Sequence, residues 1–233
     1  MRFPEIFANA GVRIGHGAVL HGPSGCGKTL LARAMEKETG FNVIFVKGPE
    51  LLSKYIGASE ENVRKVFQRA RQSRPSLVVF DEFDSLVPKR GHDSTGVTDR
   101  VVNQFLTELD GVDTSMEGVY VLAATSRIEL IDVALLRPGR LGQKISVELP
   151  SEEERAEILR IQSRDLRLEN PDVLREVATR TGGWSGAELR GLIDDEQPEV
   201  TVAALNEAFD EMLKERKRKT QPKVVEGPRV SLA

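Results

Sequence analysis

Residues 22–29 have the types and the spacing that hold a phosphate group. The stretch runs Gly22-Pro-Ser-Gly-Cys-Gly-Lys28-Thr29, a Gly-x4-Gly-Lys-Thr pattern. Glycines let backbone N–H groups turn toward phosphate oxygens, while the lysine neutralises the β- and γ-phosphates and the threonine hydroxyl is a ligand for Mg²⁺. A Gly-rich turn can match such a pattern by chance, but this one follows an apolar run and opens a helical pattern. The sequence therefore predicts a site for ATP with Mg²⁺.

Two adjacent carboxylates, Asp81 and Glu82, follow the apolar residues 77–80. In open α/β sheets ligands bind at the carboxyl ends of the strands. There Asp81 can hold Mg²⁺ directly or through water, and Glu82 can face the γ-phosphate and take a proton from the attacking water. The alternative is an acidic loop after a buried strand. Behind a phosphate loop, the pair favours hydrolysis over binding alone.

A third candidate position is Ser126, at the end of the apolar run 119–124. Its hydroxyl can donate a hydrogen bond to the γ-phosphate or orient water. A plain turn at a strand end is the alternative, and residue type alone favours that turn. The hypothesis for Ser126 therefore depends on the two motifs described above.

The elements that must position these residues alternate along the chain. Residues 18–20, 41–46, 77–80, 119–124 and 144–149 read as strands, and residues 28–38, 59–73 and 98–109 read as helices. Strands that alternate with helices predict a parallel sheet with helices on both faces. The expected buried stripes are Leu30, Leu31, Ala34 and Met35 in the first helix, Val63, Val66, Phe67 and Ala70 in the second, and Val101, Val102, Phe105, Leu106 and Leu109 in the third.

The pattern changes at Pro150. Residues 151–154, Ser-Glu-Glu-Glu, form a helix-start signal. Only helical patterning follows, as far as residue 218. We therefore expect an α/β domain over 1–149, a small all-helical domain over 150–218, and a mobile tail over 219–233.

Composition excludes several classes of protein. The chain has 233 residues, with 33 Lys and Arg against 36 Asp and Glu, a net charge of −3, and one Cys. This balance argues against a dedicated nucleic-acid binder. One Cys cannot make a disulfide framework or a Cys-based zinc site. No apolar run is long enough to cross a membrane, and residues 1–4 do not resemble a signal peptide. We expect contact with a membrane only through partners.

Longer stretches resemble the AAA family of ring-forming ATPases. They include the Asp81-Glu82 pair, Leu135-Leu-Arg-Pro-Gly-Arg140 and Gly183-Trp-Ser-Gly-Ala-Glu-Leu189. The strings at 46–60, 90–104 and 119–127 are more specific, and they resemble the second, C-terminal ATPase domain of the peroxisome-biogenesis branch of that family. The resemblance implies a P-loop AAA parallel sheet flanked by helices, followed by a helical lid.

The resemblance also implies roles for residues. Arg137 and Arg140 look like arginine fingers, which reach the ATP site of a neighbouring subunit and stabilise charge on the transferring phosphoryl group; residue types alone favour a surface turn there. Lys54, Tyr55 and Ile56 look like a pore loop that grips an extended polypeptide, the alternative being a Tyr packed on the core. The full set expected to bind nucleotide is Gly22, Pro23, Ser24, Gly25, Cys26, Gly27, Lys28, Thr29, Leu30, Gly186 and Ala187, the last two from the lid. Trp184 is expected to pack within the lid.

The sequence departs from the general family pattern in several places. Ser126 stands where most members carry Asn, and the peroxisomal branch shares this Ser. Leu141-Gly142-Gln143 replaces the usual Phe-Asp-Arg. The helical segment after Leu192 is short, and the usual segment before residue 22 that holds adenine is largely missing. We expect a fragment of a longer protein that is monomeric or weakly associating by itself.

The leading functional hypothesis is a Mg²⁺-dependent ATPase motor of a hexameric translocase. The resemblance implies a hetero-hexamer with peroxin-6 that extracts the ubiquitinated import receptor peroxin-5, in the cytosol and at the cytosolic face of the peroxisomal membrane. Two alternatives remain: a generic AAA unfoldase or complex disassembler outside peroxisomes, and a nucleotide-gated scaffold with negligible hydrolysis. The sequence contains no His-Glu-x-x-His stretch, so we do not expect peptidase activity.

Overall fold

The computed structural model divides into two compact units, residues 1–149 and 150–233. It describes residues 16–52, 58–89, 96–111, 116–164, 167–168, 173–194, 199–200, 208–214 and 216. Within these residues, no helix combines the length and the apolar character that a membrane crossing requires.

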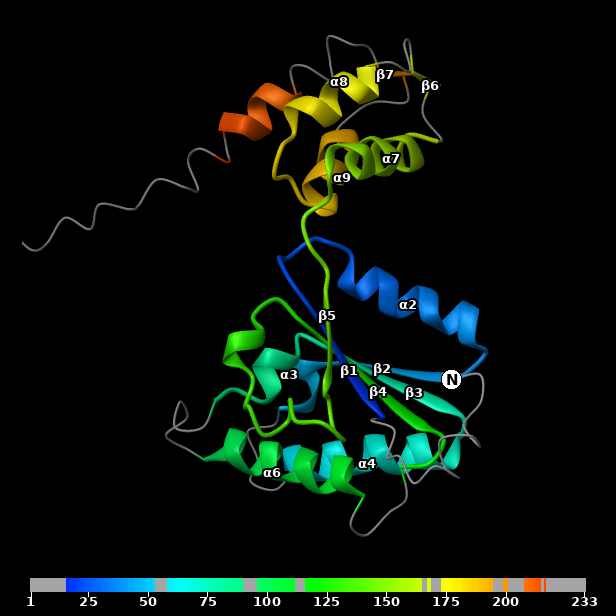
Figure 1. Cartoon of the computed structure of the whole chain (residues 1–233), viewed down its shortest axis with the longest axis vertical. Coiled ribbons are helices and arrows are strands. Elements are labelled where there is room, and N and C mark those ends of the chain that lie inside the picture. The colour runs from blue at the N-terminus through cyan, green and yellow to red at the C-terminus, as the bar shows by residue number, and fades with distance from the viewer. Residues whose placement is uncertain are drawn as a thin grey trace, which may run out of the picture. The chain divides into compact units, whose positions relative to one another are not determined.

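Strands and helices alternate through unit 1 (Figure 1). They are β1 Gly17–His21, α2 Lys28–Thr39, β2 Asn42–Lys47, α3 Gly48–Leu51, α4 Ala58–Gln72, β3 Ser76–Asp81, α5 Phe83–Leu86, α6 Val97–Asp110, β4 Val119–Thr125, a 3₁₀ turn Ile128–Leu130, and β5 Gln143–Ser146. The predicted sheet is confirmed: the strands are parallel, in the order β2-β3-β4-β1-β5. The short helices α3 and α5 were not predicted, because four residues are too few to show a period.

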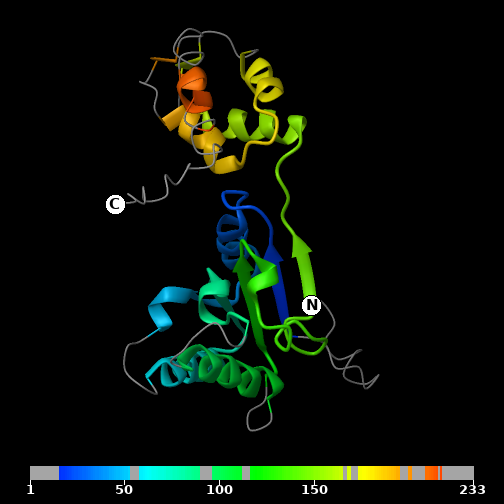
Figure 2. The ribbon, with the colours of Figure 1, turned by 90° about the vertical axis from the view of Figure 1, so that its left-hand side faces the viewer.

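Helices cover both faces of the sheet, as Figures 1 and 2 show. On one face α4 and α6 run side by side and bury their predicted stripes with the α5 residues Phe83 and Leu86. Four phenylalanines form the centre of this core, where the ring of Phe105 lies 5.1 Å from Phe80, 5.4 Å from Phe83 and 6.0 Å from Phe67, all edge-on. Such aromatic pairs add to the free energy gained by burial.

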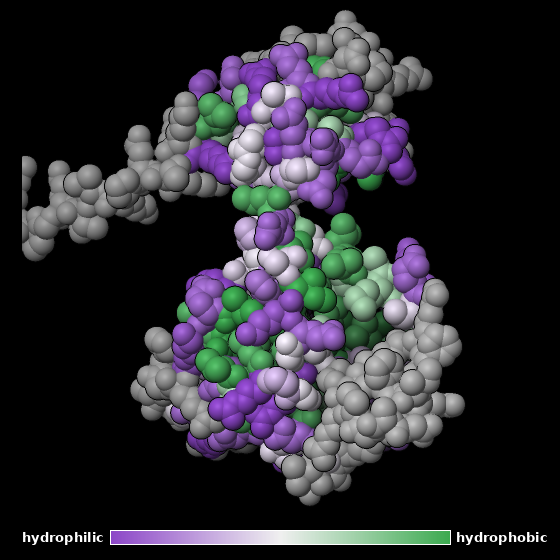
Figure 3. Space-filling model, in the orientation of Figure 1, coloured by the Kyte–Doolittle hydropathy of each residue, from purple (hydrophilic) through white to green (hydrophobic). Residues whose placement is uncertain are grey.

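The opposite face is covered by α2, and here the predicted stripe is wrong for Leu30, Leu31 and Ala34, all of which are exposed, and right for Met35. Ala32 is buried and Met35 packs against the sheet, whereas Leu30 is 73% and Leu31 45% exposed. The small Ala32 lets the helix approach the apolar strands closely, and this rotates both leucines outward. Hydrophobic surface is visible around α2 in Figure 3, and Phe45 of β2 is a further exposed apolar residue of this face.

Unit 2 is mainly helical, with α7 Glu152–Gln162, α8 Val173–Arg180, α9 Gly186–Asp194 and helical residues 208–214. The predicted start of α7 is confirmed by a capping box, in which Ser151 Oγ accepts from Glu154 N at 3.3 Å and Ser151 N donates to Glu154 Oε2 at 2.8 Å. The expectation of an all-helical unit is wrong in one detail. A parallel pair, β6 Arg167–Leu168 with β7 Glu199–Val200, is present, and strands of two residues leave no sequence pattern.

Trp184 lies in the core of unit 2, as expected. It is 3% exposed and stacks on Phe209 at 5.5 Å. Two cations flank this pair of rings, with the Arg180 guanidinium 4.3 Å from the Phe209 ring centre and the Arg216 guanidinium 5.7 Å from that of Trp184. Cation–π contacts of this kind stabilise aromatic pairs. These contacts therefore tie Phe209 and Arg216 to α8 and to the loop before α9.

The aromatic core of unit 1 predicts the effect of one truncation. Phe105→Ala is expected to lower the free energy of unfolding by about 3 to 5 kcal/mol, because it removes a fully buried ring and leaves a cavity. Urea denaturation of the purified chain followed by circular dichroism measures this change. Phe45→Ala is the matched control, since Phe45 is 37% exposed. Equal losses in the two variants would contradict the assignment of the core.

Candidate functional site

The loop between β1 and α2 wraps around its own lysine. Lys28 is 8% exposed, and its Nζ donates to the carbonyl oxygens of Gly22 at 2.8 Å and Pro23 at 2.7 Å. Gly25 and Gly27 have φ of 78° and 91°, in the left-handed region that glycine tolerates best. Left-handed residues in a loop aim successive N–H groups to one side, which makes an anion-binding concavity. This geometry suits a phosphate held at the start of α2.

Sterics also require a glycine at position 22. Its φ is 143°, and a Cβ added there would lie 2.0 Å from the carbonyl oxygen of Val147. The loop therefore leaves β1 in close contact with the segment after β5, and no larger residue fits without displacing that backbone.

Asp81 meets Thr29 across the sheet edge. Thr29 Oγ1 donates to Asp81 Oδ2 at 2.7 Å, and the other oxygen, Oδ1, accepts from Glu82 N at 3.0 Å. The two residues are far apart in sequence, but parallel strands bring their carboxyl ends to the same edge. A carboxylate and a hydroxyl are hard oxygen donors, which Mg²⁺ prefers. The donor set of this pair therefore fits Mg²⁺.

Glu82 has a backbone conformation that is rare for its residue type. Its φ is 52° and its ψ 44°, and its carbonyl oxygen accepts from Ser85 N at 3.0 Å and from Ser85 Oγ at 2.7 Å. A left-handed non-glycine residue costs about 1 to 3 kcal/mol, and such residues cluster at functional sites. Gly48 packs on this turn, since a Cβ there would lie 2.5 Å from the Glu82 carbonyl oxygen. The exposed side chain of Glu82 leaves β3 at a sharp, supported corner.

One cavity of about 330 Å³ joins these parts. Its lining contains five of the predicted site residues, Ser24, Lys28, Asp81, Glu82 and Ser126. The other lining residues were not predicted from the sequence: Asp84, Ser85, Ala124, Thr125 and Arg127. The third carboxylate in Asp81-Glu-Phe-Asp84 was a visible signal, but residue types do not show which way it points.

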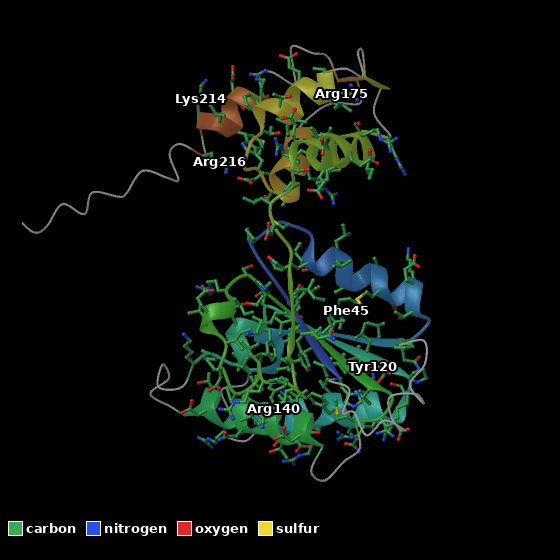
Figure 4. The ribbon with its side chains drawn as sticks, in the orientation of Figure 1. Phe45, Tyr120, Arg140, Arg175, Lys214 and Arg216 are labelled. Carbon is green, nitrogen blue, oxygen red and sulfur yellow. The ribbon has the colours of Figure 1, made fainter. Side chains whose placement is uncertain are left out.

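The two predicted arginine fingers differ in their surroundings. Arg137 is exposed. Arg140, which Figure 4 shows beside α6, donates from Nε and Nη2 to the two oxygens of Asp110 at 2.6 and 2.7 Å, and from Nη1 to the carbonyl oxygen of Ala134 at 2.6 Å. These bonds hold the pKa of Asp110 below its usual range and raise that of Arg140. For Arg140 to reach a neighbouring protomer, its guanidinium must leave Asp110.

The remaining predicted residues lie elsewhere. Leu30 is on the exposed side of α2, and Gly186 and Ala187 begin α9 of unit 2. Cys26 is partly exposed within the phosphate loop. The predicted pore loop, Lys54 to Ile56, lies outside the described residues.

The pair of Asp110 and Arg140 predicts a pH-dependent contribution to stability. Because the pKa of Asp110 is lower in the folded chain, the contribution is present at neutral pH and is lost as pH falls through the folded pKa. Asp110→Asn is expected to cost about 1 kcal/mol at pH 7, after allowance for solvent screening, and almost nothing well below pH of about 4. Urea denaturation of both chains across this range measures the difference. A difference that does not change with pH would contradict this role.

Comparison with known proteins agrees with this geometry. The family described as "ATPase family associated with various cellular activities (AAA)" matches residues 18–149. The peroxisomal ATPase PEX1 of Arthrobotrys oligospora is 56% identical over 192 residues, which are 82% of this chain and 16% of that protein. The proteins of the same name from Saccharomyces cerevisiae and Homo sapiens are 52% and 54% identical over 200 and 199 residues, covering 82% and 85% of this chain and 19% and 15% of those proteins.

The chain thus spans less than a fifth of the length of these relatives. The matched range holds the phosphate loop, both carboxylates of the β3 corner, Ser126 and both arginines of residues 135–140. The chain belongs to the AAA family of ATPases.

Proposed function

We propose that this chain is the ATP-hydrolysing motor module of a hexameric AAA translocase. The observation that carries the proposal is the single cavity lined by Lys28, Asp81, Glu82 and Ser126, which come from three different strand ends. A site built only to hold nucleotide needs the lysine and the loop. Hydrolysis also needs a group that takes a proton from the attacking water, and the carboxylate of Glu82 lies beside them.

The phosphate loop has to exchange contacts when it binds. Lys28 would replace its bonds to two carbonyl oxygens with bonds to phosphate oxygens, and it already lines the cavity. Thr29 and Asp81 would hold Mg²⁺, which supplies positive charge to the β- and γ-phosphates when bound. Their present hydrogen bond keeps both oxygens at one place. The protein therefore needs little rearrangement to complete this part of the site.

Glu82 is the proposed general base. Its side chain would accept the proton of the attacking water, and general-base catalysis of this kind contributes about 10²- to 10⁴-fold in rate. Ser126 would donate its hydroxyl to the γ-phosphate from the neighbouring strand. Arg137 and Arg140 would act on the site of an adjacent protomer, where an arginine stabilises charge in the transition state. Arg137 is exposed, so its side chain is open to such a neighbour.

Similarity supports a peroxisomal setting for the whole protein. The relatives that are 52–56% identical are named peroxisomal ATPases. We propose that the full-length protein assembles with peroxin-6 and extracts ubiquitinated peroxin-5, in the cytosol and at the cytosolic face of the peroxisomal membrane. Lys54, Tyr55 and Ile56 would grip the polypeptide, and Gly186 and Ala187 would close on the nucleotide. An unfoldase outside peroxisomes and a scaffold that does not hydrolyse ATP are the competing functions.

Glu82→Gln separates hydrolysis from binding. Glutamine keeps the shape of the side chain but is no base, so turnover is expected to fall by about 10²-fold or more while ATP still binds. Phosphate release and nucleotide affinity of the full-length protein in its ring measure both effects. Glu36→Gln, an exposed position on α2, is the control. Unchanged turnover in Glu82→Gln would remove Glu82 as the base.

Tyr55→Ala tests the polypeptide grip. Without the aromatic side chain the ring is expected to release its client unprocessed while it keeps much of its ATP turnover, because the grip and the phosphate site are separate parts. Extraction of a labelled polypeptide by the reconstituted ring measures this, and Tyr55→Phe serves as the conservative control. Normal extraction by Tyr55→Ala would rule the pore loop out.

A further inference from the structure

The carboxylate of Asp84 lies at the centre of a small hydrogen-bond network beside the phosphate cavity. Asp84 is in the first turn of α5, two residues after Glu82, and its side chain is 11% exposed. Its Oδ1 accepts from Thr125 Oγ1 at 2.8 Å. Its Oδ2 accepts from Arg127 Nη2 at 3.1 Å and from Arg127 Nε at 3.3 Å. One carboxylate therefore holds two residues of the neighbouring strand end.

These contacts form a closed ring. Thr125 Oγ1, which donates to Asp84, also accepts from the backbone N–H of Arg127 at 3.0 Å. Thr125 is 1% exposed, so its hydroxyl is fixed inside the protein. The ring thus joins α5 to the end of β4, across more than 40 residues of sequence. It fixes the backbone on both sides of Ser126.

Ser126 is the residue between the two arms of this ring. It is exposed and lines the same cavity as Glu82, whose own backbone is held by Ser85 of α5. The first turn of α5 therefore supports the corner that carries Glu82, and Asp84 of the same turn supports the strand end that carries Ser126. Displacement of a catalytic group by about 1 Å can lower the rate about 10²-fold, so a fixed spacing between Ser126 and Glu82 would favour fast hydrolysis.

The contribution of this ion pair to stability is expected to be small. The Arg127 side chain is 64% exposed, and exposed ion pairs contribute little to the free energy of unfolding. The main effect of this hydrogen-bond ring is therefore expected on the positions of the groups it holds, and less on stability.

We infer that Asp84 and Arg127 are positioning residues, which set the spacing between Ser126 and Glu82 for hydrolysis. This inference rests on the proposed function, because it assigns a role within the same site. The residues are not in the reaction themselves: Asp84 acts through Thr125 and Arg127, and these act through the backbone of Ser126.

The test uses full-length rings that carry Asp84→Ala, Asp84→Asn, Arg127→Ala, Arg127→Lys or the double variant Asp84→Ala with Arg127→Ala. For each ring, kcat, KM, the Kd of a fluorescent ATP analogue and the melting temperature are measured. Both single alanine variants are expected to lower kcat about tenfold or more, with Kd within about threefold of the wild type. Arg127→Lys keeps the charge but loses the two-pronged contact, so its kcat is expected to lie between wild type and Arg127→Ala.

The kcat of the double variant is expected to be no lower than that of the more impaired single variant, since either change breaks the same hydrogen-bond network. Glu61→Ala is the matched control, because it removes a surface ion pair with Arg64 in the same unit. Wild-type kcat in Arg127→Ala, or additive losses in the double variant, would overturn the inference. So would losses of kcat matched by equal losses of ATP affinity. If Asp84→Ala does not fold, Asp84→Asn and Arg127→Ala decide the result.

Glu82→Gln in the same assay separates failure of the proposed function from failure of the positioning role. If wild type and Glu82→Gln turn ATP over equally, the proposed function itself fails. If Glu82→Gln is inactive while the Asp84 and Arg127 variants run at the full rate, only the positioning role fails.

Discussion

The parallel register of β3, β4 and β1 is the constraint on which the rest of the structure depends. Phe80 pairs with Ala123, and Leu20 pairs with Ala124 on the other side of β4. This register ends the three strands at one edge and brings Thr29, Asp81 and Ser126 together. A slip by one residue would turn every side chain of a strand to the opposite face. The buried apolar residues on both faces therefore specify the site as well as the fold.

Much of this arrangement could be predicted from the sequence. The strands and long helices of unit 1 have strong periods, and the phosphate loop and the carboxylate pair carry their chemistry in their residue types. The stripe of α2 was wrong because Leu30 and Leu31 outweigh Ala32 in any count of apolar residues, whereas close packing on the sheet favours the smaller side chain. Composition cannot represent that steric preference.

The parts that could not be predicted are mostly contacts between distant residues. Asp84 with Arg127 and Asp110 with Arg140 join segments 43 and 30 residues apart. The strain at Glu82 is also invisible in the sequence, since it comes from the α5 turn and the close approach of Gly48. These features share a cause, because each depends on where two distant segments of the backbone meet. A sequence records residue types but not these meeting points.

The stack in unit 2 has an optical consequence. Trp184 is the sole tryptophan of the chain, and it contacts both the Phe209 ring and the Arg216 guanidinium. Emission excited at long ultraviolet wavelengths therefore originates in unit 2 alone, and unit 1, with the whole phosphate site, is silent in this signal. A red shift of the Trp184 emission would therefore report the unfolding of unit 2 without any introduced dye.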